Sequence, residues 1–430
     1  MRDMGNRISQ FDVDKLGRYV EIFPGFAFKS ERFTADPADV ALVKGENVQQ
    51  GFVDWGSSKY WPIADADLFS KFELRVGDVV LAMDRPWVTA GLKWAYIKTH
   101  DPRALLVQRV SRLRAKKGLN QTYLRCLISS GYFSDYIQPI VTGVNIPHIS
   151  GKQIGDFKIP LPPLPIQQKI AAILSAYDDV IENNQRRIAL LEKMAEEIYR
   201  EWFVRLRFPG YEKVTFVKGV PEGWGRTKVA TLTSYLKRGV APQYDDLAEG
   251  LAINQKCIRD GKLDLDFARH QSKDVPADRQ VRFGDVLVNS TGEGTLGRVA
   301  QVLVPIPNCI VDSHVTIVRP KPNVPIHYFG MTLKAWEVHF ITMGRGATNQ
   351  TELAPSVIGG VEVTVPSKPL QDTFESHAGP LFAQITHLTA QNERLVRTRD
   401  LLLPRLISGK LSVENLDIQF PLGMEESAYA

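Results

Sequence analysis

The chain has 430 residues, of which 44% are hydrophobic, and a formal net charge of +5. This length favours roughly two to four domains with buried cores. The sequence has no apolar run of about 18 residues that could span a membrane, and its start has no apolar stretch typical of a signal peptide. Its three cysteines, Cys126, Cys257 and Cys309, are widely separated, which favours buried reduced thiols over disulfides or a zinc cluster. We therefore expect a soluble, cytoplasmic protein.

The first 160 residues have the pattern of a mixed α/β domain, because short β-branched and aromatic runs alternate with Gly and Pro. Residues 75–82 predict a turn and a buried strand, residues 84–93 a loop or hairpin, and residues 120–137 a helix. A run of five cations within nine residues precedes this helix. Such a run is usually a solvated face, and the functional alternative is a clamp for phosphate groups. The five cations are Arg109, Arg112, Arg114, Lys116 and Lys117.

A long helix is predicted after the proline-rich segment at residues 160–165. Its prolines favour an extended entry, and no further Pro or Gly follows until Pro209. The sequence therefore predicts one long helical region, with a break near Asp178 as the alternative. From Ile181 onward a four-and-three spacing selects a coiled-coil seam with charged flanks, in which Asn184 would fix the register. The seam consists of Ile181, Asn184, Ile188, Leu191, Ala195, Ile198 and Trp202.

A second seam lies 204 residues later and indicates an internal duplication. The same offset relates Gln167 to Gln371, and an offset of 207 relates Arg-Val-Gly-Asp-Val at 75–79 to Arg-Phe-Gly-Asp-Val at 282–286. The chain is thus predicted to hold two copies of a globular domain followed by a long helix. Asn392 and Arg399 make the second seam less regular than the first. It consists of Ile385, Leu388, Asn392, Leu395, Arg399, Leu402 and Leu406.

The second copy contains the glycine spacing of a dinucleotide-binding motif at residues 292–297. That motif requires a helix directly after it, so that the helix N-terminus meets the pyrophosphate. The following residues, 298–305, are β-rich and end in proline. We therefore interpret the segment as a glycine-rich hairpin loop.

The sequence predicts a protein without a catalytic or metal centre of its own. Asp312, Ser313 and His314 are the residue types of a catalytic triad, but neighbours on a strand point to opposite faces. The eight histidines lack metal-ligand spacing. We also find no phosphate-binding loop of the G-x-x-x-x-G-K-S/T type and no amino-methyltransferase or nuclease motif.

Positive charge is concentrated in the two globular copies. Residues 1–160 hold 22 Lys and Arg against 17 Asp and Glu, and residues 211–370 hold 19 against 16. Residues 161–210 are balanced at 7 against 7, and residues 371–430 are acid-rich at 5 against 8. A nucleic-acid surface needs such an excess in the globular parts, although many ordinary domains carry a similar one.

The helical motifs resemble those of the specificity subunits of type I restriction-modification systems. IPLPPLPIQQKIAAILS at 159–175 and DDVIENN at 178–184 are similar to the central conserved region of that family. VPEGW at 220–224 is similar to the opening of its second target-recognition domain, and LLPRLISGKL at 402–411 to the end of its distal helix. The resemblance covers nearly the whole chain.

This resemblance implies an α/β architecture with two tandem mixed α/β target-recognition domains, each followed by a long helix. The two helices would form an antiparallel coiled coil with pseudo-two-fold internal symmetry. The expected parts are recognition domain 1 at 1–160, a central conserved helical region at 161–207, recognition domain 2 at 208–366, and a distal helical region with the tail at 367–430.

The resemblance also implies a function. Each recognition domain would read one half of a split, asymmetric target in double-stranded DNA, and the paired helices would set the gap between the halves. The helices would dock two methyltransferase subunits, and restriction subunits would complete the complex. S-adenosylmethionine, ATP and Mg are expected in those partners, with no cofactor in this chain. The alternatives are a stand-alone nucleic-acid-binding regulator and a catalytic protein with an unrecognised site.

Candidate DNA contacts follow from the side chains that reach base edges and phosphates, which are Arg, Lys, Asn and Gln. Asn145 and Asn349 occupy equivalent places in the two copies, which fits a structural turn as well as a DNA contact. Trp87 fits a core position better than a contact. The candidates are Arg85, Arg112, Arg114, Lys116, Lys117, Asn145, Asn289, Arg298, Arg345, Asn349 and Gln350.

Overall fold

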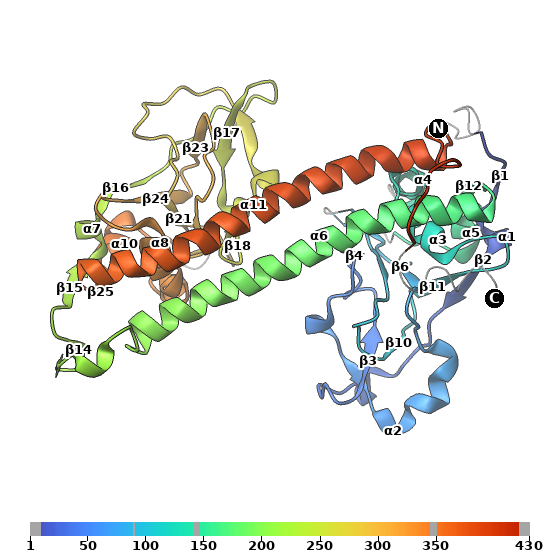
Figure 1. Cartoon of the computed structure of the whole chain (residues 1–430), viewed down its shortest axis with the longest axis horizontal. Helices are drawn as coiled ribbons and strands as arrows, with labels where there is room; N and C mark the ends of the chain where they lie inside the picture. The colour runs from blue at the N-terminus through green and yellow to red at the C-terminus, as the bar shows by residue number, and fades with distance from the viewer. Residues whose placement is uncertain (1–9, 89–90, 142–146, 345–350, 421–430) are drawn as a thin grey trace. The chain divides into compact units, whose positions relative to one another are not determined.

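The computed structural model describes residues 10–88, 91–141, 147–344 and 351–420 (Figure 1). The chain divides into two compact units, unit 1 with Met1–Glu182 and Asn392–Ala430, and unit 2 with Asn183–Gln391. The division falls inside both long helices, α6 (Leu164–Tyr199) and α11 (Lys368–Ile407). Each unit therefore combines one globular part with a segment of each helix.

Unit 1 contains two small sheets that share a core. The larger sheet has the order β2-β11-β6-β9-β4, and the smaller has the order β10-β3-β5 with β10 parallel to β3. Buried side chains from both sheets, such as Val43, Val80 and Leu106, pack in one cluster. The strands are β1 Val13–Lys15, β2 Val20–Pro24, β3 Val40–Val43, β4 Gln50–Gly51, β5 Tyr60–Trp61, β6 Val79–Ala82, β7 Trp87–Val88, β8 Gly91–Leu92, β9 Trp94–Tyr96, β10 Ala104–Leu106, β11 Val110–Ala115 and β12 Lys158–Pro160.

The expected helix at 120–137 is two helices, α3 (Gln121–Ile128) and α4 (Gly131–Val141). Asn120 caps the first by accepting a hydrogen bond from the Tyr123 amide at 3.0 Å. Ser130 ends it, because its hydroxyl donates to the Leu127 carbonyl at 2.6 Å and accepts from the next helix at 3.3 Å. The short helices of unit 1 are α1 Leu16–Tyr19, α2 Ile63–Ala66 and α5 Gly151–Gly155.

Unit 2 repeats this arrangement with a sheet of order β16-β24-β21-β22 and a sheet of order β20-β17-β23, in which β17 and β23 are parallel. Its strands are β13 Phe216–Val217, β14 Val220–Pro221, β15 Gly225–Lys228, β16 Thr233–Arg238, β17 Gly250–Ile253, β18 Ile258–Arg259, β19 Lys262–Leu263, β20 Arg269–Gln271, β21 Val286–Asn289, β22 Val299–Gln301, β23 Cys309–Val311, β24 Val315–Pro320 and β25 Glu362–Val365. Its helices are α7 Val229–Leu232, α8 Ile326–Ala335, α9 Glu337–Thr342 and α10 Pro355–Gly360.

The same ion pair, with a buried aspartate, lies in the larger sheet of each unit. Asp78 pairs with Arg114 at 2.5 Å in unit 1, and Asp285 pairs with Arg319 at 2.7 Å in unit 2. Each aspartate also accepts the backbone amide three residues before it, at 2.7 and 2.8 Å. The turn between them contains Gly77 or Gly284, whose φ values of 87° and 89° favour glycine. The sequence motif at 75–79 and 282–286 is thus a structural turn.

The long helix α6 runs without interruption through Asp178, so the alternative of a break there is wrong. One π-helical turn, Arg200–Val204, follows it. Every residue of both predicted seams is buried or partly buried. In unit 1 the Asn392 side chain donates to the Ile181 carbonyl at 3.2 Å, and in unit 2 the Asn184 side chain donates to Gln391 at 3.1 Å.

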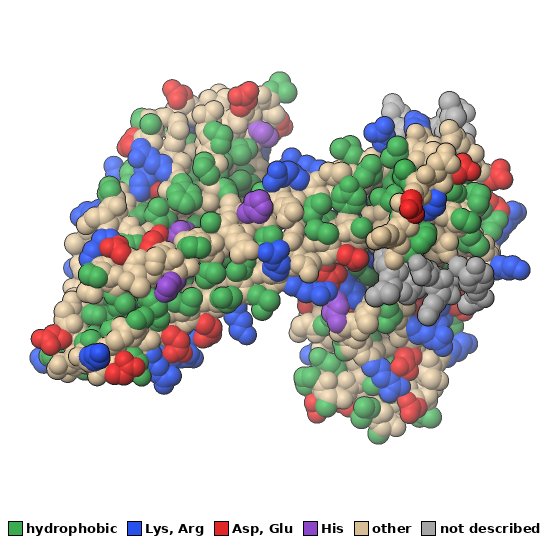
Figure 2. Space-filling view, viewed as in Figure 1, with side chains coloured by type: hydrophobic (Ala, Val, Ile, Leu, Met, Phe, Trp, Pro, Cys, Tyr) green, Lys and Arg blue, Asp and Glu red, His purple; other side chains and the backbone are tan. Residues whose placement is uncertain are grey.

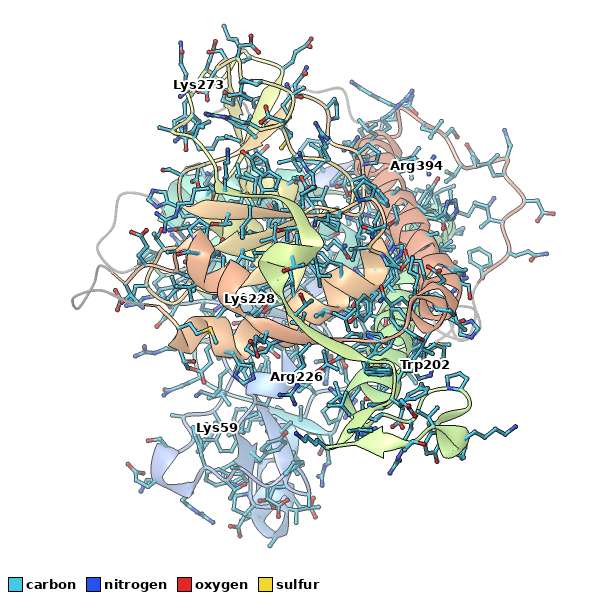
Figure 3. All side chains as sticks on the ribbon, turned by 90° about the vertical axis from the view of Figure 1, so that its left-hand side faces the viewer. Lys59, Trp202, Arg226, Lys228, Lys273 and Arg394 are labelled. Carbon is cyan, nitrogen blue, oxygen red and sulfur yellow. The ribbon has the colours of Figure 1, made fainter. Side chains whose placement is uncertain are left out.

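The two helix segments in each unit run in opposite directions and are part of the core (Figure 1). Leu174 of α6 and Leu406 of α11 belong to the main hydrophobic cluster of unit 1. In unit 2, Tyr199, Trp202 (labelled in Figure 3) and Phe374 form an aromatic cluster with Tyr328 of α8. Helix packing and domain packing are therefore continuous within each unit.

The three cysteines are free and buried, as expected. Burial raises the pKa of Cys126 and Cys257 to about 11 and that of Cys309 to about 12. The thiols therefore stay protonated at neutral pH, which makes them poor nucleophiles. Within the described residues, no helix is long and apolar enough to cross a membrane.

The Asp285–Arg319 pair generates a stability prediction. Asp285→Ala leaves the Arg319 guanidinium, with a side chain only 10% exposed, without its carboxylate. We expect unit 2 to lose about 3–5 kcal/mol of stability. Hydrogen-exchange mass spectrometry should show faster exchange in β21 and β24, with β6 and β11 of unit 1 unchanged. Asp278→Ala is the matched control, because Asp278 is exposed and offers Arg319 only its backbone carbonyl. Unchanged exchange in β21 and β24 would contradict the assignment.

Candidate nucleic-acid interface

Two basic side chains meet the Asp84 carboxylate beyond the end of β6 in unit 1, and Arg85 follows Asp84 in the loop. We call these four residues the first loop cluster (Asp84, Arg85, Arg109 and His148). Asp84 pairs with Arg109 at 3.0 Å and with His148 Nδ1 at 2.5 Å. The Arg109 side chain is 70% exposed, and Arg85 is also exposed. Cations therefore outnumber the single carboxylate on this surface, which favours an anionic partner.

The backbone around the first loop cluster is tightly fixed. The Met83 amide donates to the Arg109 carbonyl at 2.8 Å, and the Ile149 amide donates to the Met83 carbonyl at 2.8 Å. Arg85 and Arg109 have positive φ values of 43° and 67°, which non-glycine residues rarely adopt. Such strained residues often cluster at functional sites, where the surrounding structure holds them in place.

The corresponding place in unit 2 carries a different set of side chains, the second loop cluster (Arg238, Thr291, Arg298, His314 and Glu352). The Thr291 hydroxyl is hydrogen bonded to His314 Nδ1 at 2.7 Å, and Arg238 pairs with Glu352 at 2.8 Å. Arg298 donates to the Gly294 carbonyl at 2.8 Å. This set offers both donors and acceptors, as base edges do.

The backbone frame is the same in both clusters. In unit 2 the Ser290 amide donates to the His314 carbonyl and the Leu353 amide donates to the Ser290 carbonyl, each at 2.8 Å. These bonds correspond to those of Met83 and Ile149 in unit 1. Because backbone bonds are indifferent to side-chain identity, the frame is retained while the presented chemistry changes.

Only some of the DNA-contact candidates predicted from the sequence lie in the two loop clusters. Arg85 lies in the first loop cluster and Arg298 in the second. Lys116 and Lys117 are exposed beyond the end of β11. Trp87 is partly buried and packs against the core, as its core interpretation predicts. The candidates Asn145, Arg345, Asn349 and Gln350 lie outside the described residues.

Two candidates are buried and Arg114 is partly buried in an ion pair, and we leave all three out of the proposed contacts. The Arg112 side chain is 5% exposed, pairs with Glu21 at 3.1 Å and lies over the Phe23 ring. Arg114 is bound by Asp78. Asn289 is fully buried and donates to the carbonyls of Gln255 and Thr295 at 3.0 and 3.1 Å. The basic run is thus partly strand, since Arg112 and Arg114 belong to β11, which lies between β2 and β6 in the sheet.

Sequence reasoning did not select Asp84, His148, Arg238, His314 and Glu352 as contacts. The internal duplication in the sequence could have identified two pairs of equivalent positions in the loop clusters. The offset of 204 relates His148 to Glu352, and an offset of 205 relates Arg109 to His314. Aligning the copies at these turns would have marked both positions as equivalent places with different chemistry.

Other exposed cations are spread over the surface. Figure 2 shows Lys and Arg interspersed with Asp and Glu on the visible face of each unit. Arg226 and Lys228 of β15 and Lys273 after β20 are exposed in unit 2 (Figure 3). The Arg269 guanidinium stacks 3.6 Å from the centre of the Tyr244 ring, an arrangement that can also stack on a base.

The glycine-rich segment at 292–297 connects the antiparallel strands β21 and β22, which confirms the hairpin loop. A strand rather than a helix follows it, so the geometry of a dinucleotide site is lacking. Within the described part of the chain, no group of three or more His, Cys, Asp or Glu could hold a metal ion.

Comparison with known proteins finds a matching family model and relatives of this chain. Residues 44–193 match the model of the type I restriction modification DNA specificity domain. The chain is 27% identical over 327 residues to the type I restriction enzyme MjaIX specificity subunit of Methanocaldococcus jannaschii, covering 70% of this chain and 71% of that protein. It is 24% identical over 418 residues to the EcoBI specificity subunit of Escherichia coli, covering 91% and 84%.

A solved structure supports the fold. The S subunit of a type I restriction-modification system from M. genitalium superimposes with a TM-score of 0.59 at 15% identity, covering 94% of this chain and 98% of that one. At this identity the likeness shows the fold alone. The sequence matches confirm the family resemblance read from the helical motifs.

Proposed function

This chain belongs to the specificity subunits of type I restriction-modification systems, and we propose that it recognises a bipartite, asymmetric target in double-stranded DNA. Each globular part reads one half of the target. The paired segments of α6 and α11 form an antiparallel coiled coil with pseudo-two-fold symmetry that sets the gap between the halves. The recognition domains correspond to residues 1–160 and 208–366, and the helical regions to 161–207 and 367–430.

The single observation that carries this proposal is the shared backbone frame with unlike side chains. A protein that reads two different half-sites needs the same docking geometry twice and different base-reading groups each time. The first loop cluster offers Arg109 and His148, and the second offers Thr291, His314 and Glu352. Arg favours guanine, whereas hydroxyl and carboxylate groups accept from other bases.

Partner subunits supply the chemistry in this proposal. Methyltransferase subunits bring S-adenosylmethionine, and restriction subunits bring ATP and Mg, so that this chain needs no cofactor. A docking surface on the helices is supported by exposed apolar side chains one turn apart, Leu190 at 62% and Met194 at 51%. Isolated exposed apolar residues are common, but these two lie within about one turn of each other and of the exposed charged residues Arg187, Lys193 and Glu196.

The decisive experiment expresses this chain with the methyltransferase encoded beside it and maps methylated adenines by long-read sequencing. A split motif that disappears when this chain is omitted would support the specificity role and give the target. Copurification of the two proteins without any motif would contradict DNA recognition. Failure of the two proteins to associate would contradict the docking proposal.

Substitutions in the loop clusters test the assignment of one half-site to each unit. Arg109→Ala should relax recognition of the first half-site and His314→Ala that of the second, each by about 1–3 kcal/mol, or roughly 5- to 150-fold in affinity. Binding to targets with single changes in either half measures this effect. The two variants are each other's control, and equal losses in both halves would contradict the assignment.

The gap is tested by lengthening both helices together. Insertion of seven residues after Glu182 and seven after Gln391 preserves the seam spacing and adds about 10 Å to each helix. At 3.4 Å per base step, the accepted gap should grow by about three base pairs, as methylome mapping would reveal. Insertion into α6 alone should instead misalign the seam and reduce stability. An unchanged gap in the paired insertion would rule out the spacer role.

A further inference from the structure

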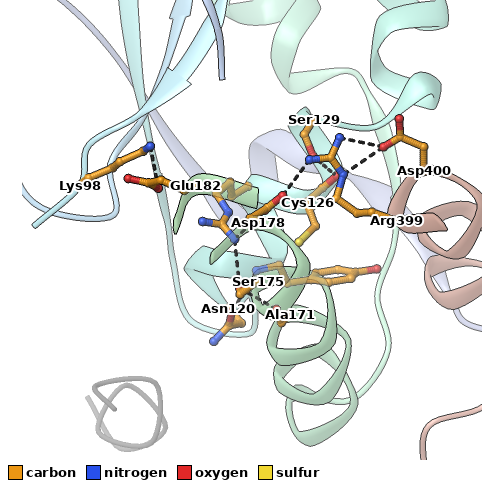
Figure 4. Close-up of polar contacts among 12 residues, drawn as sticks. Lys98, Asn120, Cys126, Ser129, Ala171, Ser175, Asp178, Glu182, Arg399 and Asp400 are labelled. Atoms are coloured by element: carbon orange, nitrogen blue, oxygen red, sulfur yellow. Dashed lines mark hydrogen bonds and ion pairs between the residues drawn. The ribbon is translucent and has the colours of Figure 1, made fainter. Parts of the chain in front are cut away.

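In unit 1, α6 and α11 meet at a partly buried network of charges (Figure 4). Asp178 Oδ1 accepts from Arg399 Nη1 at 2.7 Å, and Asp178 Oδ2 accepts from Arg125 Nη2 at 3.1 Å. Arg125 also donates to the Ser175 hydroxyl at 3.0 Å and lies over the Tyr96 ring. The side chains of Asp178, Arg399 and Arg125 are 24%, 31% and 11% exposed. Solvent therefore screens these charges only in part.

The equivalent level of unit 2 has no such charges. The repeat offset of 204 relates Asp178 to Phe382 and Arg399 to Ala195. Ala195 is fully buried, and Phe382 stacks on His327 with ring centres 4.7 Å apart. The two repeats thus differ at one matched pair of positions, charged in unit 1 and uncharged in unit 2.

This difference matters because the duplication makes wrong pairings available. In two copies of the chain, α6 could pair with the α6 of the second copy, or α11 with its α11, in the same antiparallel register. The apolar seam would not prevent this, since Ile181 and Ile385 are identical, as are Leu191 and Leu395. Selection against these pairings requires residues that differ between the repeats.

We propose that the Asp178–Arg399 pair favours pairing of α6 with α11 of the same chain. It disfavours α6–α6 and α11–α11 pairing between two copies of the chain. An α6–α6 pair would place Asp178 against Ala195, and an α11–α11 pair would place Arg399 against Phe382. Either arrangement sets a partly buried charge against an apolar side chain and removes one of its two ion pairs, because Asp178 keeps only Arg125 and Arg399 keeps only Asp400, which is unfavourable. A single polar seam position determines the partner in coiled coils in the same way.

A second polar contact acts in the same direction. In unit 2 the Asn184 side chain donates to Gln391 at 3.1 Å. The repeat offset relates Asn184 to Leu388 and Gln391 to Arg187. A pair of α11 helices would set Leu388 against Gln391, so the amide–amide bond would be lost together with the ion pair.

The test mixes two full-length copies that carry different affinity tags, unfolds them together, refolds them and quantifies mixed-tag species by native mass spectrometry. Arg399→Leu removes the charge that an α11–α11 pair would bury. We expect at least a tenfold higher fraction of mixed species for this variant than for the unsubstituted chain. Arg397→Leu is the matched control, because it makes the same change at an exposed position of the same helix and should leave the fraction unchanged.

The outcome is informative even if Arg399→Leu fails to refold. Asp178→Asn retains a hydrogen-bonding oxygen for Arg125 and Arg399 but removes the charge that an α6–α6 pair would bury, so it should also raise the mixed fraction. Equal mixed fractions for the unsubstituted chain and both variants, with helix content intact by circular dichroism, would overturn the proposal. The test contains no DNA, so its result is independent of target recognition.

Discussion

The mutual burial of α6 and α11 is the constraint on which the rest of the structure depends. Helices of 36 and 40 residues each carry a mostly apolar seam, and such helices are stable mainly because that seam is buried. Each unit buries it with one segment of each helix, and these segments also enter the core of the globular part. The folded unit therefore differs from the sequence repeat: unit 1 is complete only when the last helix of the chain has returned to it.

The parts of the fold that depend on local periodicity could be predicted from the sequence, and those that depend on distant partners could not. The seam spacing and the proline entry were sufficient for α6, and the glycine loop was correctly assigned to a hairpin. The single helix expected at 120–137 failed because Ser130 bonds both neighbouring helices. The basic run misled the prediction of DNA contacts because its ion-pair partners are distant in sequence. Arg112 pairs with Glu21, 91 residues away, and Arg114 pairs with Asp78, 36 residues away.

The least regular position of the second seam has an explanation that periodicity could not supply. Arg399 breaks the apolar pattern, which by itself suggests weaker pairing. In the structure it meets Asp178, which lies one turn before the start of the predicted first seam, and Asp178 in turn is held by Arg125 of α3. A polar residue inside a seam is most costly when its partner is missing, and that partner is visible only after the helices are placed side by side.

In the loop clusters the backbone frame is shared by both units, whereas the exposed side chains differ. Under the proposed function, this difference explains how one fold could recognise two half-sites. Backbone hydrogen bonds at 2.8 Å hold the turn before each loop cluster, and an Asp–Arg pair with a buried aspartate holds the turn that leads into the central strand. None of these bonds uses the exposed side chains beyond the strand end. Substitutions there can change the chemistry offered to a base at little cost in stability, since exposed positions usually tolerate change. Under the proposed function, a duplicated domain built in this way can diverge in target while its two helices remain matched to each other.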